Sequence, residues 1–250
     1  MATSSTTAPA RRVFLVRMAS ASAAIPASAV LAASADALAQ STQNAPSPSP
    51  AAAAPPEGYA FLGPTESAFV ETMVNVMCPA DGLTPNGVDC GLAIYIDRQL
   101  AGAFGRGDRL YMQGPWLSGP PQLGYQLPLT PAQFARAGIA AANVACQARY
   151  GGKTFDQIDV QQADAFLLDV TAGKVVTPRL SLADWFNGLM YPLFAEACFS
   201  DPMYGGNKGK VFWSLIGYPG LPAFHTQDMV TYRGKPFPGA KTPQSIADFS

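Results

Sequence analysis

Helical periodicity, bounded by capping residues, is the feature of this sequence that most restricts its fold. Between residues 65 and 77 the apolar side chains recur at the spacing of one helix face. Comparable helices are expected at about 91–104, 130–149 and 159–173, and from 181 onward. No run of alternating β-branched residues is long enough to predict a strand. We therefore expect an all-α domain, an irregular helical bundle with long Gly/Pro-rich loops.

Polar capping residues set the expected helix starts. A Ser, Thr or Asp side chain accepts a hydrogen bond from an open N–H of the first turn, and a Gln three residues later can return it. These starts are expected at Thr65, at Thr130 with Pro131 and Gln133, at Asp159 with Gln162, and at Ser181. Pro192 falls inside the last helix and should kink it, because proline lacks the N–H that the helix needs.

The N-terminal region has the layout of an export signal. Arg11 and Arg12 precede an apolar, Ala- and Ser-rich stretch, and Ala37-Leu38-Ala39 has the small-x-small form of a cleavage site. Paired arginines followed by Val-Phe-Leu predict a twin-arginine signal peptide over residues 1–39, with an ordinary secretory signal as the alternative. Polar residues interrupt the stretch, so it lacks the ~20 predominantly apolar residues of a membrane-spanning helix. The mature chain is therefore expected in the periplasm, without a transmembrane segment.

A second change of composition separates this signal from the folded part. Residues 40–56 carry no charged side chain and consist largely of Ser, Pro and Ala. Such a composition buries too little apolar area to offset the entropy of ordering, which predicts a flexible linker over residues 40–57. Residues 58–250 are then expected to form a single helical domain.

Charge is sparse throughout the sequence. Sixteen Lys and Arg oppose seventeen Asp and Glu, and charged residues make up 13% of the chain, whereas soluble domains usually have about 25%. Either another chain covers much of the surface, or this is an ordinary low-charge extracytoplasmic domain. No basic patch indicates a nucleic acid as partner.

The cysteines and the histidine do not form a metal or haem motif. The four cysteines are Cys78, Cys90, Cys146 and Cys198, and the sole histidine is His225. They include no C-x-x-C pair, so we expect no metal site in this chain. We predict a disulfide between Cys78 and Cys90, which bracket a Pro- and Gly-rich loop. Cys146 and Cys198 either form a second bridge or remain buried thiols.

No catalytic or cofactor-binding residue can be assigned from the sequence. His225 has no accompanying G-x-S-x-G nucleophile elbow. Neither G-x-G-x-x-G nor a P-loop motif is present, so no dinucleotide or nucleotide site is expected. We accordingly expect no cofactor in the chain and no enzymatic activity from the chain alone.

The most informative tract lies between residues 199 and 220. Its candidate interface residues are Tyr204, Gly205, Gly206, Asn207, Trp213, Gly217, Tyr218, Pro219 and Gly220. Gly205 and Gly206 allow a positive φ and the close approach of another backbone, so a bulkier residue at Gly206 is expected to force an unfavourable φ. Pro219-Gly220 suits the centre of a type II turn. Either these loops form a docking surface, in which Tyr and Trp are typical anchors, or they merely cover the core.

The same tract carries a resemblance to a known family. Asp201-Pro202-Met203-Tyr204-Gly205-Gly206-Asn207, then Trp213, then Ile216-Gly217-Tyr218-Pro219-Gly220 resemble the D-P-x-Y-G-G-N and I-G-Y-P-G signature of the gluconate 2-dehydrogenase subunit 3 family. The likeness extends over residues 63–220.

The resemblance implies a non-catalytic small subunit of a membrane-associated dehydrogenase complex. Its partners would be a large FAD subunit of the glucose-methanol-choline (GMC) oxidoreductase type and, commonly, a multihaem cytochrome c with haem c. The small subunit would stabilise the flavoprotein and supply the signal read by the Tat translocase. The alternative is a solitary extracytoplasmic binding or scaffold protein with no flavoprotein partner.

Overall fold

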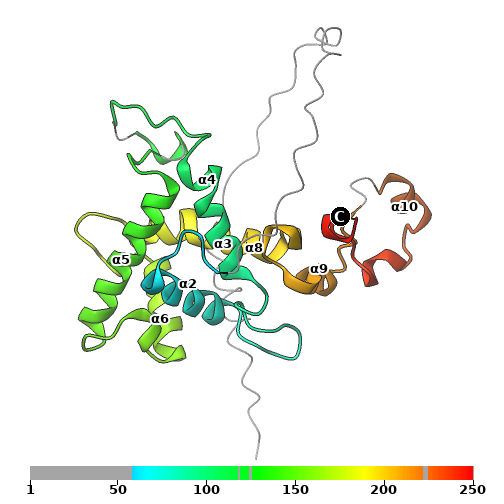
Figure 1. Cartoon of the computed structure of the whole chain (residues 1–250), viewed down its shortest axis with the longest axis horizontal. Helices are drawn as coiled ribbons and strands as arrows, with labels where there is room; N and C mark the ends of the chain where they lie inside the picture. Colours follow the sequence, from blue (N-terminus) through cyan, green and yellow to red (C-terminus); the bar gives the residue numbers. More distant parts are fainter. Residues whose placement is uncertain (1–57, 118, 124–125, 222–224, 250) are drawn as a thin grey trace, which may run out of the picture.

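The computed structural model describes residues 58–117, 119–123, 126–221 and 225–249. The predicted signal peptide with Arg11 and Arg12 and the predicted linker lie outside these residues. Within the described ranges, the regular structure is helical apart from one isolated bridge between Gly220 and Gln244 (Figure 1). The expectation of an all-α, irregular bundle is confirmed. None of the helices described is both long and apolar enough to cross a membrane.

Two groups of helices follow one another along the chain. The bundle contains α2 (Pro64–Met77), α3 (Leu92–Ala101), α4 (Ala103–Arg106), α5 (Pro131–Arg149), α6 (Val160–Thr171), α7 (Leu182–Trp185) and α8 (Tyr191–Phe199). It also includes the short turns η1 (Pro121–Leu123) and η2 (Phe155–Gln157). The later elements are η4 (Pro202–Tyr204), η5 (Lys208–Lys210), α9 (Val211–Ile216), α10 (Thr226–Thr231), η6 (Pro238–Lys241) and η7 (Ile246–Phe249). Figure 1 shows α10 and the C-terminus on the far side of α9 from α5 and α6.

The capping residues predict three helix starts correctly. Ser181 Oγ accepts the Asp184 N–H at 3.1 Å at the start of α7. Thr130 Oγ1 accepts the Gln133 N–H at 3.2 Å, and Gln133 Oε1 accepts the Thr130 N–H at 2.9 Å. Asp159 and Gln162 make the same reciprocal pair at the start of α6. These bonds satisfy donors that have no partner inside the helix.

The first two helices differ from the prediction. The first is capped at Gly63 rather than at Thr65, because Pro64 is pre-organised for the first turn and Glu66 Oε2 accepts the Gly63 N–H at 2.8 Å. The second ends at Ala101 rather than near Phe104, because Gly102 adopts an extended conformation that separates α3 from α4.

The helix that contains Pro192 changes its hydrogen-bond pattern just before the proline, whereas the predicted kink stays a prediction. Residues 186–190 form a π-helical turn (η3), in which the Tyr191 N–H donates to Phe186 O, five residues back. Since Pro192 has no N–H to continue the regular ladder, the chain widens here and α8 begins at Tyr191.

Aromatic side chains from four segments form the centre of the bundle. The ring centroids of Phe69 and Phe155 are 4.5 Å apart, and Phe166 and Trp185 lie within 6 Å of this pair. All four side chains are completely buried. Burying each large apolar side chain contributes roughly 1.5–3 kcal/mol, so this cluster is a principal source of the stability of the bundle.

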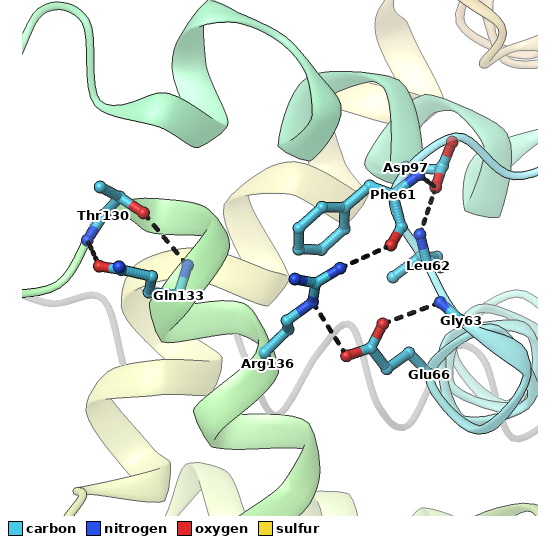
Figure 2. A network of polar contacts seen from close by, with 8 residues as sticks. All are labelled: Phe61, Leu62, Gly63, Glu66, Asp97, Thr130, Gln133 and Arg136. Atoms are coloured by element: carbon cyan, nitrogen blue, oxygen red, sulfur yellow. Dashed lines mark hydrogen bonds and ion pairs between the residues drawn. The ribbon is translucent and has the colours of Figure 1, made fainter.

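A buried carboxylate fixes the point at which the chain enters the bundle (Figure 2). Asp97 on α3 accepts the backbone N–H groups of Ala60, Phe61 and Leu62 at 2.7–2.8 Å. Arg136 on α5 donates to Phe61 O at 3.0 Å and lies 4.2 Å from the centroid of the Phe61 ring. The segment is thus held by α3 and α5 together, through contacts that helical periodicity does not predict.

Candidate docking surface

The segment of residues 200–218 that follows α8, here called the motif loop, is tied to the bundle by its own polar groups. Asp201 begins the loop by accepting the Met203 N–H at 3.0 Å, which caps η4. Further on, the Lys208 N–H donates to Cys90 O at 2.9 Å. The loop therefore lies against the start of α3, although it comes more than a hundred residues later in the sequence.

The two adjacent glycines of the motif are needed for contact with the bundle itself. Gly205 has φ +99°, and a Cβ there would lie 2.6 Å from Arg98 Nη1 and 2.9 Å from Ile94 Cγ2 on α3. Gly206 is outside the left-handed region, and its Cβ would lie 2.5 Å from Ala197 O on α8. The expectation that Gly206 needs an unusual φ is wrong. The backbone that leaves no room for a side chain at Gly206 belongs to this chain rather than to a partner.

Asn207 joins the two halves of the motif loop from the inside. Its side chain is completely buried, donates from Nδ2 to Ser200 O at 3.1 Å, and accepts the Phe212 N–H at 3.0 Å. Its φ of +46° is a conformation that Asn tolerates better than most residues. Asn207 therefore shapes the loop, and its side chain is unavailable to a partner.

Trp213 also points inward, with 5% of its surface exposed. Its Nε1 donates to Phe199 O at 2.8 Å, and its ring meets that of Tyr218 edge-on, with centroids 5.1 Å apart. The buried Trp213 ring thus packs against the ring of the exposed Tyr218.

Among the predicted interface residues, the side chains available for docking are those of the two tyrosines. Tyr204 is 48% exposed and Tyr218 is 44% exposed. Gly217 is exposed, Pro219 is half-buried and Gly220 is buried. Gly220 has φ +72°, the conformation that the predicted turn requires, and a Cβ there would lie 2.0 Å from Gln244 O.

Three further exposed apolar side chains of the motif loop were missed by sequence reasoning. They are Met203, Leu215 and Ile216. The last two lie on α9, which is too short for helical periodicity to separate a buried face from an exposed one. Together with Tyr204 and Tyr218 they form what we call the loop anchors: Met203, Tyr204, Leu215, Ile216 and Tyr218.

The cysteines are all buried. Cys78 and Cys90 approach the same acceptor, Pro85 O, with their sulfur atoms at 3.7 and 3.6 Å from it. The disulfide between them stays a prediction. Cys146 is completely buried on α5, where desolvation raises the pKa of its thiol to about 11. Such a thiol is protonated and unreactive at neutral pH.

The titratable groups near the motif loop are engaged with one another. Tyr95 on α3 donates to Glu196 Oε2 on α8 at 3.3 Å, and burial together with the charge of Glu196 raises the pKa of Tyr95 to about 12. His225 has its Nδ1 3.1 Å from Asp228 Oδ2 and its Nε2 3.3 Å from Gly220 O. The described residues include no group of three or more His, Cys, Asp or Glu placed to hold a metal ion.

One comparison with known proteins gives a match. The family described as gluconate 2-dehydrogenase subunit 3 matches residues 64–220. No curated protein and no solved structure gives a significant match to the chain. The matched region begins at the first residue of α2 and ends at Gly220, so it contains the bundle and the motif loop, whereas the residues after it lie outside.

Proposed function

The chain belongs to the gluconate 2-dehydrogenase subunit 3 family, and from this premise we propose that it is the non-catalytic small subunit of a periplasmic, membrane-associated, FAD-dependent dehydrogenase complex. In this proposal FAD is held by a GMC-type large subunit, and haem c by a cytochrome c subunit where one is present. The small subunit stabilises the flavoprotein and carries it through the Tat translocase.

The observation that supports docking at the motif loop is the contrast between its two sides. Gly205, Gly206, Asn207 and Trp213 are occupied by contacts within the chain. The loop anchors, in contrast, are apolar and exposed. A loop that is held rigidly loses little conformational freedom on binding, so aromatic anchors on it can contribute most of their contact energy to affinity.

The export role is supported by Arg11 and Arg12. The twin-arginine route accepts folded cargo, so a signal on this subunit can serve a flavoprotein that has already bound FAD and folded. Replacing both arginines by lysine is expected to leave both chains in the cytoplasm. A flavoprotein that still reached the periplasm would contradict the carrier role.

The docking role is tested by co-expressing the full chain with the proposed flavoprotein large subunit and measuring affinity by pull-down, with flavin absorbance as the readout. Truncation of a central aromatic anchor typically costs ~2 kcal/mol or more, so Tyr204→Ala and Tyr218→Ala should each weaken the complex about thirtyfold. Melting of each variant without its partner should change little, because both side chains are half exposed.

Tyr111 provides the matched control, since it is an exposed tyrosine in the loop between α4 and α5. Tyr111→Ala should leave the complex unchanged. Wild-type affinity in both the Tyr204 and Tyr218 variants would overturn the assignment of the docking surface.

A further inference from the structure

The segment after the motif loop, which we call the arm (residues 219–249), differs from the rest of the chain in its burial. Of its described residues only Gly220 and Ser245 are buried, and neither has a large apolar side chain. Met229 and Val230 on α10 are 68% and 76% exposed, and Ile246 and Phe249 near the C-terminus are exposed as well. The described part of the arm therefore buries no large apolar side chain.

Polar contacts nevertheless close the arm back onto the motif loop. The Ile246 N–H donates to Asp201 Oδ2 at 2.9 Å, and Lys210 forms an ion pair with Asp248. Gln244 and Gly220 form the isolated bridge, with the Gln244 N–H donating to Pro219 O at 2.9 Å, which joins the C-terminal part of the arm to its first residues. The C-terminal end of the arm therefore returns toward α9 (Figure 1).

Such contacts do not account for the order of a segment this long. Fixing one residue costs roughly 1–2 kcal/mol in backbone entropy, whereas one intramolecular hydrogen bond contributes a net of about 0.5–1.5 kcal/mol. In the bundle, buried side chains supply the difference. The arm has apolar side chains whose burial could offset this entropy, but no described residue of the chain covers them. A surface outside the chain can supply the missing burial.

The arm also has a hollow that suits a side chain from another protein. Its volume is 380 Å³, and it is lined by Tyr218, Pro219, His225, Asp228, Met229, Tyr232, Lys235 and Phe237. The rings of Tyr232 and Phe237 meet edge-on, with centroids 5.2 Å apart, and form an aromatic wall. Because Tyr218 is both a loop anchor and a residue that lines the hollow, the hollow is continuous with the docking surface proposed above.

The charges of the arm identify the kind of partner. Asp228 and Asp248 are engaged with His225 and Lys210, whereas Arg233, Lys235 and Lys241 are exposed and make no ion pair among the described residues. A symmetric contact with a second copy would bring these cations together, which is unfavourable. An apolar patch bordered by acidic side chains on a different protein is complementary to the arm.

We propose that the arm is a second docking element, which closes over an apolar, acid-bordered patch of the flavoprotein large subunit. This inference rests on the proposed function, because it takes the same partner. The motif loop and the arm then hold the large subunit at two adjoining places. The arm supplies apolar contact through Met229 and Val230 and electrostatic attraction through Arg233 and Lys235.

The test measures the affinity of the full chain for the large subunit in the co-expressed complex. The double variant Met229→Asp/Val230→Asp should weaken the complex at least tenfold, and Arg233→Glu/Lys235→Glu should weaken it most at low salt, where charge attraction is least screened. Val144→Asp and Val176→Asp are matched controls, because both are exposed valines of the bundle region, and they should have no effect. The isolated double variants should melt like the wild type.

The outcomes separate this inference from the proposed function. Unchanged affinity in both double variants, with weakening by Tyr204→Ala, would overturn the arm proposal and leave docking at the motif loop intact. Weakening by the arm variants without an effect of Tyr204→Ala or Tyr218→Ala would support the arm and refute the loop. If the wild-type chain elutes as a dimer and the Met229→Asp/Val230→Asp variant elutes as a monomer, the arm binds a second copy and the proposal is overturned. A wild-type chain that binds no flavoprotein would also overturn the proposal.

Discussion

The bundle and the arm are ordered by different means. In the bundle, aromatic side chains from α2, η2, α6 and α7 are completely buried against one another. In the described arm, attachment depends on backbone hydrogen bonds, the Lys210–Asp248 ion pair and the acceptor Asp201. The comparison shows that regular structure alone does not indicate where a chain is stable in isolation. The burial of apolar side chains does indicate this stability. It predicts that the bundle is stable alone and that the arm is stabilised by a partner that covers it.

The largest effect is expected in the bundle, at Asp97. Asp97→Ala removes the acceptor of three backbone N–H groups, of which that of Leu62 is buried and those of Ala60 and Phe61 are part-buried. A buried N–H left unpaired costs about 1–3 kcal/mol, and a part-buried one costs less because water reaches it. We expect the free energy of unfolding to fall by about 3 kcal/mol or more, measured by urea denaturation. Asp97→Asn, which keeps one side-chain oxygen, should lose less. A loss below about 1 kcal/mol in the alanine variant would show that the entry segment contributes little to the bundle.

A smaller effect is expected where the motif loop meets the bundle. In Gly206→Ala the new methyl group would meet the backbone oxygen of Ala197 at 2.5 Å, and overpacking of this kind costs about 1–3 kcal/mol. Gly188→Ala is the control, because a Cβ at Gly188 meets nothing within 4 Å. A thermal melt in which the two variants behave alike would indicate that the loop can move away from α8.

Sequence reasoning succeeded where local signals determine the structure. The Thr130–Gln133 and Asp159–Gln162 capping boxes depend on neighbours in the chain, and both were predicted. Asp97 was missed because its partners lie 35–37 residues earlier. For the motif, the residue types indicated the right segment but not the direction of each side chain. Asn207 and Trp213 point inward because Ser200 and Phe199 offer them backbone oxygens, a tertiary fact that no spacing rule contains.

In the arm, loss of an attachment should change mobility more than stability. Asp201→Ala removes the acceptor of the Ile246 N–H and the cap of η4, and each such exposed hydrogen bond contributes about 1 kcal/mol or less. We expect limited proteolysis to cut the arm faster while the unfolding midpoint of the bundle stays nearly constant. Asp108→Ala, which removes an exposed aspartate paired with Arg106, should change neither. An equal loss of bundle stability in Asp201→Ala would mean that the arm and the bundle unfold together.

The smallest effect concerns the protonation of His225. Asp228 Oδ2 and Gly220 O can only accept hydrogen bonds, so both contacts form together only when His225 is protonated. The hydrogen bond to Asp228 and that to the Gly220 carbonyl raise the pKa of His225 above 6.5. This contribution to arm order is fully present below the unfolded-state pKa and is lost as pH rises through the folded-state pKa.

Proton NMR can follow this titration directly, because the chain has one histidine. We expect the His225 ring resonance to titrate with a higher midpoint than in the urea-unfolded chain, and Asp228→Asn to lower that midpoint. Equal midpoints in the folded and unfolded chains would contradict the pairing of His225 within the arm.

Hydrogen exchange of the full chain, alone and in complex with the flavoprotein large subunit, tests most directly whether the partner completes the arm. The amides of α5 and α6 should exchange slowly in both samples, because the buried core protects them. The amides of residues 226–249 should exchange rapidly in the free chain and at least tenfold more slowly in the complex. Arm amides that exchange at the same rate in both samples would contradict the account.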